Sequence, residues 1–170
     1  MPSGKESNPP LDYSFRNLIS VDELGKTKPR RGLKRYHKTP SGLYECQALR
    51  LNNNQLTSIQ GIHSICYQLL EEPEKLTWLD VSFNKLTSVS PEISEFPNLK
   101  ILYLHGNFLK DLNKVLQTLK KLPQLYNLTM HGNPLVEHKK YRMRILNALT
   151  QLRSLDFTNV TVSDKFFRKI

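Results

Sequence analysis

The chain has 170 residues, and its 25 Lys and Arg side chains against 15 Asp and Glu give a formal net charge of +10. This length suits a single domain, and the longest apolar run, Ile101–Leu104, is far too short to cross a bilayer. The two cysteines, Cys46 and Cys66, and a polar, proline-rich start without a secretory signal predict a reducing, intracellular compartment. Composition thus argues against a membrane protein, a disulfide-stapled miniprotein and a coiled coil.

Residues 1–45 are predicted to form an N-terminal arm. Residues 11–24 contain Tyr13, Phe15 and Leu18 among other apolar side chains, enough to cover one end of a core as a partial cap. The basic run that follows, residues 26–38, holds no acid and has seven cationic side chains: Lys26, Lys28, Arg30, Arg31, Lys34, Arg35 and Lys38. Because like charges repel, this run is predicted to be extended or disordered when free.

One motif recurs between residues 46 and 140. It has the form Leu-x-x-Leu-x-Leu-x-x-Asn-x-Leu, and its asparagines, Asn54, Asn84, Asn107 and Asn133, are 30, 23 and 26 residues apart. Cys46 stands in the first leucine position of the first copy, where a small buried hydrophobe fits. Recurrence of one unit at this period is typical of a solenoid of leucine-rich repeats, so residues 46–140 are predicted to form four such repeats.

Each position of the motif has a physical role. The leucines point inward from one short strand per repeat, and the strands are predicted to stack side by side in a parallel sheet. The asparagine amide can donate to and accept from the unpaired backbone of the turn after the strand, in a ladder along the solenoid. The segments that return to the next strand have apolar side chains at helical spacing over 62–70 and 115–122, and are irregular around 91–97.

The predicted fold class is therefore α/β: a leucine-rich repeat solenoid with a short parallel sheet on its concave side and helical or irregular returns on its convex side. Residues 141–170 are predicted to form a C-terminal cap. They hold a helical stripe from Tyr141 to Leu149, a fifth strand over Leu152–Phe157 and a short tail. Val160 stands where the motif requires asparagine, so the ladder is predicted to end there.

Several segments resemble known proteins. Residues 141–161, with Tyr141-Arg142 and a later Leu-Arg-Ser-Leu-Asp, resemble the caps of intracellular leucine-rich repeat proteins. Pro9–Phe15 and the two His-Gly-Asn turns, at 105–107 and 131–133, resemble a short, capped, ciliary type within that family, over residues 9–165. The resemblance implies a small, cytoplasmic, non-enzymatic protein of ciliated cells that is attached to the axoneme. The basic run matches no pattern of that type.

The concave face is the predicted binding surface. Side chains of a strand alternate between its two faces, so every second strand position faces this surface. Aromatic side chains flanked by polar ones are favoured in protein interfaces. The concave face is therefore predicted to bind a protein partner through Trp78, Phe83, Ile101, Tyr103, His105, Arg50 and Asp80. In the alternative, Trp78 is covered by the tail or by a long loop.

His105 and His131 occupy the same position of neighbouring repeats. A closed metal site would need further ligands, and no Cys, Asp or third His joins them in register, so surface histidines are the favoured interpretation and no metal is predicted. The sequence also contains no phosphate-binding glycine loop, no catalytic triad pattern and no close pair of carboxylates. We therefore expect no enzyme activity, no cofactor and no small-molecule substrate.

A second basic surface is predicted within residues 110–144, where eight basic side chains stand against two acidic ones. Together with the run at 26–38 it is predicted to dock on an acidic assembly, in particular the surface of tubulin. The residues assigned to this second surface are Lys139, Lys140, Arg142 and Arg144. A solvated charged face is the plainer interpretation.

The favoured function is a non-catalytic protein–protein interaction adaptor, or structural component, of a microtubule-associated complex in the ciliary axoneme. Two alternatives stay open: a component of an RNA–protein particle that uses the basic surfaces, and a regulatory subunit of an enzyme such as a phosphatase. No signature of an RNA-binding module accompanies the charge, so nucleic acid is the less favoured partner, and no membrane partner is expected. Fold alone does not decide between these functions.

Overall fold

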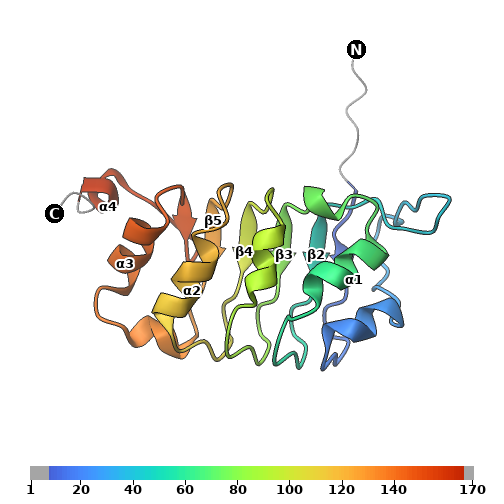
Figure 1. Cartoon of the computed structure of the whole chain (residues 1–170), viewed down its shortest axis with the longest axis horizontal. Helices are drawn as coiled ribbons and strands as arrows, with labels where there is room; N and C mark the ends of the chain where they lie inside the picture. Colours follow the sequence, from blue (N-terminus) through green and yellow to red (C-terminus); the bar gives the residue numbers. More distant parts are fainter. Residues whose placement is uncertain (1–7, 167–170) are drawn as a thin grey trace, which may run out of the picture.

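A computed structural model describes residues 8–166 of the chain (Figure 1). Within them, one sheet contains seven strands in the order of the sequence. The strands are short: β1 (Leu11–Asp12), β2 (Ala48–Arg50), β3 (Trp78–Asp80), β4 (Ile101–Tyr103), β5 (Asn127–Thr129), β6 (Ser154–Leu155) and β7 (Thr158–Asn159). Figure 1 shows the middle strands side by side along the molecule, with the helices in a second layer in front of them.

The first six strands are parallel, and their leucines are in register. Leu49 of β2 lies opposite Leu79, Leu79 opposite Leu102, and Leu102 opposite Leu128. All four are fully buried, and they belong to one core cluster whose members extend from Leu11 to Leu155. This arrangement confirms the predicted α/β leucine-rich repeat solenoid.

The asparagines form the predicted ladder. Asn107 accepts the N–H of Leu86 at 3.0 Å, and its amide nitrogen donates to the carbonyl oxygens of Val81 at 3.1 Å and Leu104 at 2.9 Å. Leu86 and Val81 belong to the preceding repeat and Leu104 to its own. Asn84 and Asn133 make the same three kinds of bond one repeat earlier and later. Each rung therefore joins two repeats through backbone groups that the strands leave unpaired.

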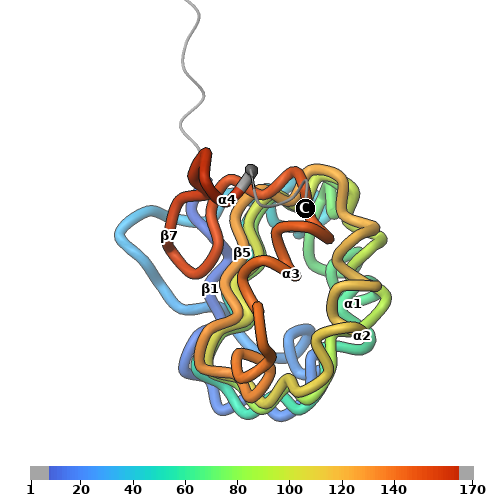
Figure 2. Tube along the Cα trace, turned by 90° about the vertical axis from the view of Figure 1, so that its left-hand side faces the viewer, coloured from blue at the N-terminus to red at the C-terminus, as the bar shows by residue number. Residues whose placement is uncertain are grey.

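The return segments lie on the other side of the core from the strands. Two of them contain the predicted helices, α1 (Ile62–Leu69) and α2 (Leu112–Leu119). The return around 91–97 holds only the short 3-10 helix η3 (Pro91–Glu95), and further 3-10 turns are η2 (Pro73–Lys75) and η4 (Pro134–Glu137). Figure 2 looks along the row of strands and shows α1 and α2 on the side of each turn opposite to the strands.

The N-terminal arm starts the sheet. Leu11 of β1 pairs with Leu49, and Asn54 accepts the N–H groups of Arg16 at 2.9 Å and Leu18 at 3.1 Å. The arm therefore continues the ladder one repeat beyond the first copy of the motif, and the 3-10 helix η1 (Val21–Gly25) packs against α1. Residues 26–45 form an irregular loop that projects from this end of the molecule (Figure 1).

The basic run has a defined path where the sequence predicted an extended or disordered segment when free. The Arg30 N–H donates to the Asp12 carbonyl oxygen at 2.6 Å. The Tyr36 hydroxyl donates to the Arg30 carbonyl oxygen at 2.7 Å and accepts the Asp12 N–H at 3.3 Å. These bonds hold the run along the outer edge of β1, and they involve backbone groups that charge patterning does not reveal.

The C-terminal cap follows the fourth repeat. Helix α3 (Tyr141–Ala148) leads to β6, which pairs with β5, and the chain then turns back in the antiparallel strand β7 and the short helix α4 (Val162–Phe166). Arg142 forms two bonds with the Asp164 carboxylate, at 3.0 and 2.9 Å, which tie α3 to α4. In Figure 2, α3 lies across the end of the row of strands. The last four residues of the predicted tail lie outside the described residues.

Candidate protein-interaction surface

The strand face that points away from the core, hereafter the open face, corresponds to the predicted concave side. A cluster of rings covers its centre and its C-terminal end. Trp78 and Tyr103 meet edge to face with ring centroids 5.9 Å apart, and Tyr103 meets Phe157 in the same way at 5.5 Å. This aromatic cluster has six members, from three consecutive repeats and the cap: Trp78, Phe83, Tyr103, His105, His131 and Phe157.

The turn after each strand positions the next ring. Phe83 has a left-handed φ of +51°, and its ring meets His105 edge to face at 5.0 Å. Gly106 permits this approach, because a Cβ on it would lie 2.6 Å from Cδ1 of Phe83. Gly106 also has a φ of +67°, which glycine adopts without steric cost. The His-Gly-Asn turn is thus the place where the Phe83 ring lies against the neighbouring repeat.

Phe157 reaches the open face by an unusual backbone route. Asp156 and Phe157 both have left-handed φ values, of +52° and +60°. Phe157 is 60% exposed, and its ring lies 5.6 Å from those of both His105 and His131. The cap therefore contributes a ring to a surface that the repeats begin.

Asp156 anchors this part of the cap. Its Oδ1 accepts the N–H groups of Met130 at 2.6 Å and His131 at 3.0 Å, and its Oδ2 accepts the Tyr141 hydroxyl at 3.0 Å. Nδ1 of His131 lies 3.4 Å from the same carboxylate. Burial, followed by the Asp156 charge, raises the pKa of Tyr141 well above its usual range, so this hydroxyl keeps its proton and donates.

His105 lies beneath the cluster. Only 8% of it is exposed, and its Nδ1 lies 2.7 Å from the Thr129 hydroxyl. Its ring stacks on that of His131 with 4.7 Å between centroids and 8° between planes. Burial, followed by the proximity of His131, lowers the pKa of His105, so the ring is neutral at pH 7.

The predicted partner-binding residues differ in accessibility. Phe83 is 54% exposed, and Trp78, Ile101, Tyr103 and Arg50 are half-buried at the surface. Asp80 and His105 are buried, which corrects the expectation that they face a partner. The Asp80 carboxylate accepts the hydroxyl of Ser82 at 2.6 Å and the backbone N–H of Ser82 at 3.0 Å. A buried carboxylate needs such donors, and here the turn after β3 supplies them.

Phe157 is the member that the sequence missed. It occupies a position of the fifth motif copy where leucine points inward, so alternation assigned it to the core. The missing ladder asparagine at Val160 is the one sequence signal that the fifth turn has a different shape. Trp78 is half-buried, and the Phe157 ring from the cap contacts its neighbour Tyr103 edge to face at 5.5 Å.

Unpartnered polar atoms gather on the open face. Among the described residues, five buried side-chain nitrogen or oxygen atoms have no hydrogen-bond partner, and four of them belong to outward strand positions or to the turn beside them. Such atoms are uncommon in folded proteins because each costs free energy. The four are Nε of Arg50, Oδ1 of Asn52, Nε1 of Trp78 and Oδ1 of Asn127.

The structure places the two predicted basic surfaces at opposite ends of the molecule. The loop with Lys26, Lys28, Arg30, Arg31, Lys34, Arg35 and Lys38 is exposed at the N-terminal end, and Figure 2 shows its tip on the strand side. Lys139 and Lys140 are exposed before α3. Arg142 is committed to Asp164, and Arg144 donates to Asn113 at 2.6 Å. These two arginines therefore each make a contact within the chain.

The described residues 8–166 contain no group of three or more His, Cys, Asp or Glu side chains able to hold a metal ion. The stacked pair His105 and His131 faces Thr129 and Asp156 with its Nδ1 atoms. None of the helices in this part of the chain is long and apolar enough to span a membrane.

In-register strands, an asparagine ladder and helical returns define a leucine-rich repeat protein. The chain belongs to the leucine-rich repeat family, whose model matches residues 67–168. It is 45% identical to leucine-rich repeat-containing protein 51 of Homo sapiens over 157 residues, which cover 92% of this chain and 81% of that protein. The identity to the same protein of Mus musculus is 43% over the same shares. These matches confirm the resemblance to a short, capped leucine-rich repeat protein that the sequence indicated.

Solved structures share the fold. The Drosophila melanogaster SNF/U2A′ complex contains a chain that superposes with a TM-score of 0.63 at 21% identity, covering 81% of this chain and 86% of that one. A leucine-rich repeat protein of Leptospira interrogans superposes with a TM-score of 0.51 at 28% identity, covering 64% of this chain and 25% of that one. Leucine-rich repeat domains are typically non-catalytic and bind other proteins with such extended surfaces.

Proposed function

We propose that this protein is a non-catalytic adaptor whose open face binds one protein partner. The aromatic cluster carries the proposal. It joins three repeats and the cap into one half-exposed surface, and aromatic side chains at the centre of an interface contribute most of its binding energy. Trp78, Phe83, Ile101 and Tyr103 make the contact, and Arg50 lies at its polar margin.

The buried members of the cluster support the exposed ones. His105 packs between Phe83 and Phe157 and holds both rings in place. Asp156 fixes the turn from which Phe157 projects. A surface held in one shape before it binds loses less entropy on association, which favours affinity. Unpartnered Nε1 of Trp78 and Nε of Arg50 add donors that a partner's oxygen atoms can satisfy once these side chains turn outward.

The proposed setting is a microtubule-associated complex of the ciliary axoneme. Two observations support it: the resemblance to a ciliary type of leucine-rich repeat protein, and the net charge of +10. The loop at residues 26–38 and the pair Lys139 and Lys140 are the cationic groups that dock on an acidic surface such as that of tubulin. A tagged protein expressed in ciliated cells will line the axoneme if this setting is correct, and a diffuse distribution outside the cilium will contradict it.

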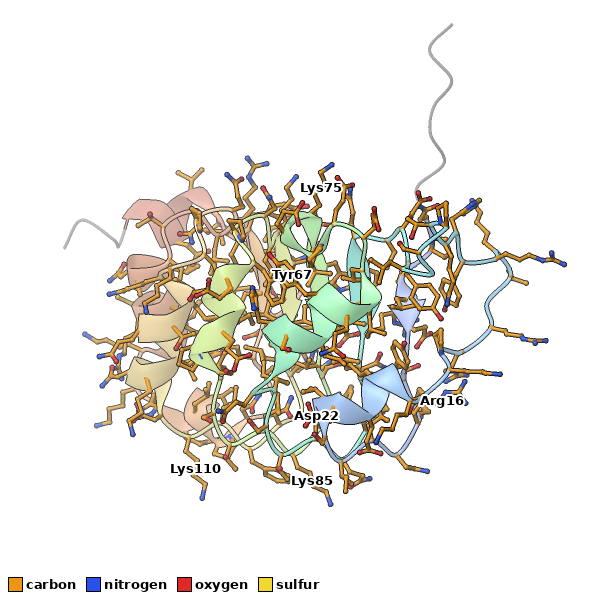
Figure 3. The ribbon with its side chains drawn as sticks, turned by 45° about the vertical axis from the view of Figure 1, so that its right-hand side comes forward. Arg16, Asp22, Tyr67, Lys75, Lys85 and Lys110 are labelled. Atoms are coloured by element: carbon orange, nitrogen blue, oxygen red, sulfur yellow. The ribbon has the colours of Figure 1, made fainter. Side chains whose placement is uncertain are left out.

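Partner capture tests the open face. Extracts of ciliated cells are passed over the wild-type chain and over the Trp78→Ala and Tyr103→Ala variants, and the bound proteins are compared. Tyr67→Ala is the matched control, because Tyr67 lies 52% exposed on α1, in the helical layer (Figure 3). We expect both open-face variants to lose the partner and the control to retain it. Equal recovery by all four proteins would defeat the proposal.

A second candidate function follows from basic and aromatic side chains at one surface, a combination that also binds single-stranded nucleic acid. A salt titration distinguishes nucleic-acid binding from the adaptor function. Binding to RNA with a steep loss of affinity as salt rises, together with no binding to microtubules, would favour a component of an RNA–protein particle.

A further inference from the structure

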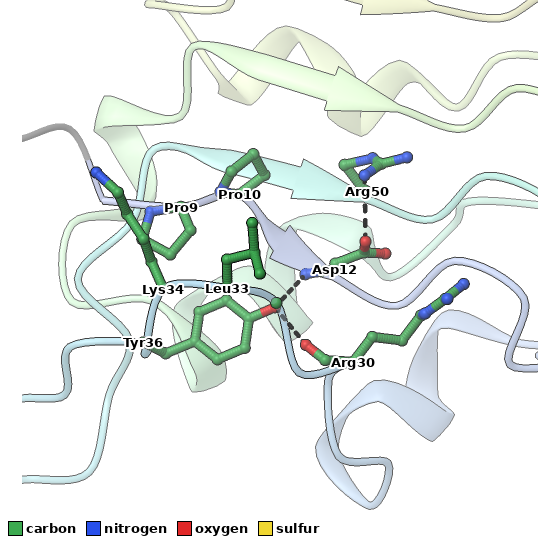
Figure 4. A pocket seen from close by; sticks show the side chains of 9 residues that line it. Pro9, Pro10, Asp12, Arg30, Leu33, Lys34, Tyr36 and Arg50 are labelled. Atoms are coloured by element: carbon green, nitrogen blue, oxygen red, sulfur yellow. Dashed lines mark hydrogen bonds and ion pairs between the residues drawn. The ribbon is translucent and has the colours of Figure 1, made fainter.

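A cavity of about 270 Å³ opens at the N-terminal end of the open face, between the start of the sheet and the basic loop. Figure 4 shows its lining in two parts. Pro9, Pro10, Leu33 and Tyr36 form an apolar part, and Arg30 and Arg50 lie at the other end, on either side of Asp12. Of the lining residues, Arg30, Lys34 and Arg50 belong to surfaces described above, and the others do not.

The cavity is built by specific bonds. The Tyr36 hydroxyl bridges the Arg30 carbonyl oxygen and the Asp12 N–H, and the Arg30 N–H closes on the Asp12 carbonyl oxygen. The Arg30 guanidinium also lies over the Phe15 ring, 5.4 Å from its centroid. The loop is thus fastened to the edge strand at Asp12, so the shape of the cavity exists before any partner binds.

The charge of the cavity is positive. Arg30 and Arg50 lie at one end of it, and Asp12 is the one carboxylate among the described residues that line it. Asp12 already binds Nη1 of Arg50 at 3.2 Å, whereas Nε of Arg50 is buried without an acceptor. A planar guanidinium is suited to bind a carboxylate with two of its N–H groups. The cavity therefore selects an anionic group, and its proline, leucine and tyrosine walls select an apolar group beside it.

We propose that this cavity receives an acidic side chain of the partner that lies on the open face, next to an apolar side chain of the same segment. This inference rests on the proposed function, and it adds the chemistry of the partner. The partner segment is acidic where it crosses β1 and β2, and apolar where it crosses β3 to β5.

Register connects the two parts of this surface. Arg50 lies opposite Asp80, and Asp80 lies opposite Tyr103, so two strand spacings separate Arg50 in the cavity from Tyr103 in the aromatic cluster. Strands lie ~4.8 Å apart, and an extended chain advances ~3.3 Å per residue, so about three residues of a partner span the distance. One short peptide segment can therefore occupy both.

The ring geometry favours a peptide over a nucleic acid. Bases stack on ring faces, but Trp78, Tyr103 and Phe157 meet edge to face, and His105 and His131 already stack on each other. The carboxylate of Asp80 also lies in the same row of the sheet as Arg50, and it repels phosphate groups. A peptide with one carboxylate next to apolar side chains avoids that repulsion.

Random peptides displayed on phage, selected on the full chain, test the inference without a known partner. Trp78 is the one tryptophan of the chain, so a shift of its emission identifies the peptides that bind the open face. We expect those peptides to carry Asp or Glu beside apolar or aromatic residues. Fluorescence anisotropy of a labelled synthetic copy then gives its affinity for each variant.

Two variants remove positive charge from the cavity, Arg30→Gln and Arg50→Gln, and Lys110→Gln makes the same change of charge at an exposed position after β4. We expect each cavity variant to weaken the acidic peptide about tenfold, the usual size of a charge-assisted contact. We expect Lys110→Gln to bind the acidic peptide as tightly as the wild-type chain does. A peptide with Gln in place of its acid should bind the wild-type chain and both cavity variants with equal affinity. Circular dichroism checks folding, and if Arg50→Gln unfolds, Arg30→Gln alone decides the result.

The possible failures are distinguishable. Peptides that shift Trp78 emission but show no preference for acids, or no response to the cavity variants, would overturn this inference and leave the proposed adaptor function standing. Tighter binding of oligouridylate than of any selected peptide, again with a shift of Trp78 emission, would overturn it in favour of nucleic acid. Selected peptides that never shift Trp78 emission would reject the open face itself and both proposals with it.

Discussion

Asn107 joins two repeats with a single side-chain amide. Three of its bonds reach Leu86 and Val81 in one repeat and Leu104 in the next. All of these backbone groups are buried near the turn, where no strand neighbour can pair them. A leucine in the core can be replaced by another apolar side chain with repacking, but only an amide supplies a donor and an acceptor at this point.

Asn107→Ala should therefore destabilise the chain more than its size suggests. The substitution leaves the Leu86 N–H without an acceptor. It also takes one of two donors from the carbonyl oxygens of Val81 and Leu104, which keep Asn84 and Asn133. We expect a loss of about 1–3 kcal/mol in the free energy of unfolding. Urea denaturation followed by circular dichroism measures it. Asn147→Ala, at an exposed position of α3, is the control and should change stability by less than about 0.5 kcal/mol. Equal effects of the two would show that the ladder does not stabilise the solenoid.

His105 makes stability depend on pH. Burial and His131 lower its pKa, while the more weakly acting charges of Asp80 and Asp156 raise it. In the unfolded chain the ring has an ordinary pKa of about 6.5. Between these two values the unfolded state binds a proton that the folded state does not, so stability rises with pH in this window and is lost as pH falls below about 6.5.

His105→Gln should flatten this dependence. Urea midpoints measured from neutral to mildly acidic pH will fall for the wild-type chain and fall less for the variant, because the glutamine has no proton to gain. His37→Gln removes an exposed histidine of the basic loop and should keep the wild-type slope. An unchanged slope in His105→Gln would mean that another group is responsible. The slope is the readout, since the substitution also alters packing.

At the scale of elements, the cap ends the solenoid with polar bonds rather than with another rung. Tyr141 of α3 reaches across to Asp156, and Asp156 holds the N–H groups of Met130 and His131 after β5. These bonds turn the chain out of the repeat path, and β7 folds back along β6. The free edge of the last parallel strand is thereby covered, which protects it from pairing with other chains.

Asp156→Ala and Tyr141→Phe should form a graded pair. Tyr141→Phe removes one donor and should cost about 1 kcal/mol, whereas Asp156→Ala strands two N–H groups and a hydroxyl and should cost about 2–3 kcal/mol. Alanine also tolerates the left-handed φ of +52° less well than aspartate does. Urea denaturation gives both values. Hydrogen exchange should show faster opening at β6 and β7 in Asp156→Ala, and a cap that stays fully protected would contradict this role.

At the scale of the whole molecule, one core connects both ends. Buried side chains from Leu11 in the arm to Leu155 in the cap form a single cluster. Each repeat contacts only its neighbours, so stability is shared through the interfaces between them. In a solenoid of so few repeats, damage at the centre should therefore unfold the whole chain.

Leu102→Ala tests this cooperativity. Leu102 is fully buried in the middle strand β4, and the cavity left behind should cost about 2–5 kcal/mol. Trp78 emission, which reports on β3, and far-ultraviolet circular dichroism, which reports on all repeats, should still show the same shifted midpoint. Ile19→Ala, at an exposed position of the arm, should leave the midpoint in place. Two separate transitions in Leu102→Ala would indicate that the ends unfold independently.

Much of this architecture can be predicted from the spacing of residues within each repeat. A leucine at every second strand position and an asparagine after each strand act within one repeat and its neighbour, so counting residues was enough to predict the strands, the ladder and the face that Trp78 and Tyr103 share. The arm was harder. Leu11 and Tyr13 pair with β2, but residues 26–45 separate them from it, and the motif has no asparagine at Arg16.

The sequence by itself determined the leucine-rich repeat solenoid, its register and most of its outward-facing rings, because each follows from a periodicity that short-range packing enforces. The tertiary structure decided the burial of Asp80 and His105, the place of Phe157 and the cavity beside β1. Those features depend on left-handed turns at Asp156 and Phe157 and on bonds between Asp12 and a distant loop, and contacts of this kind exist only after separate segments of the chain have come together.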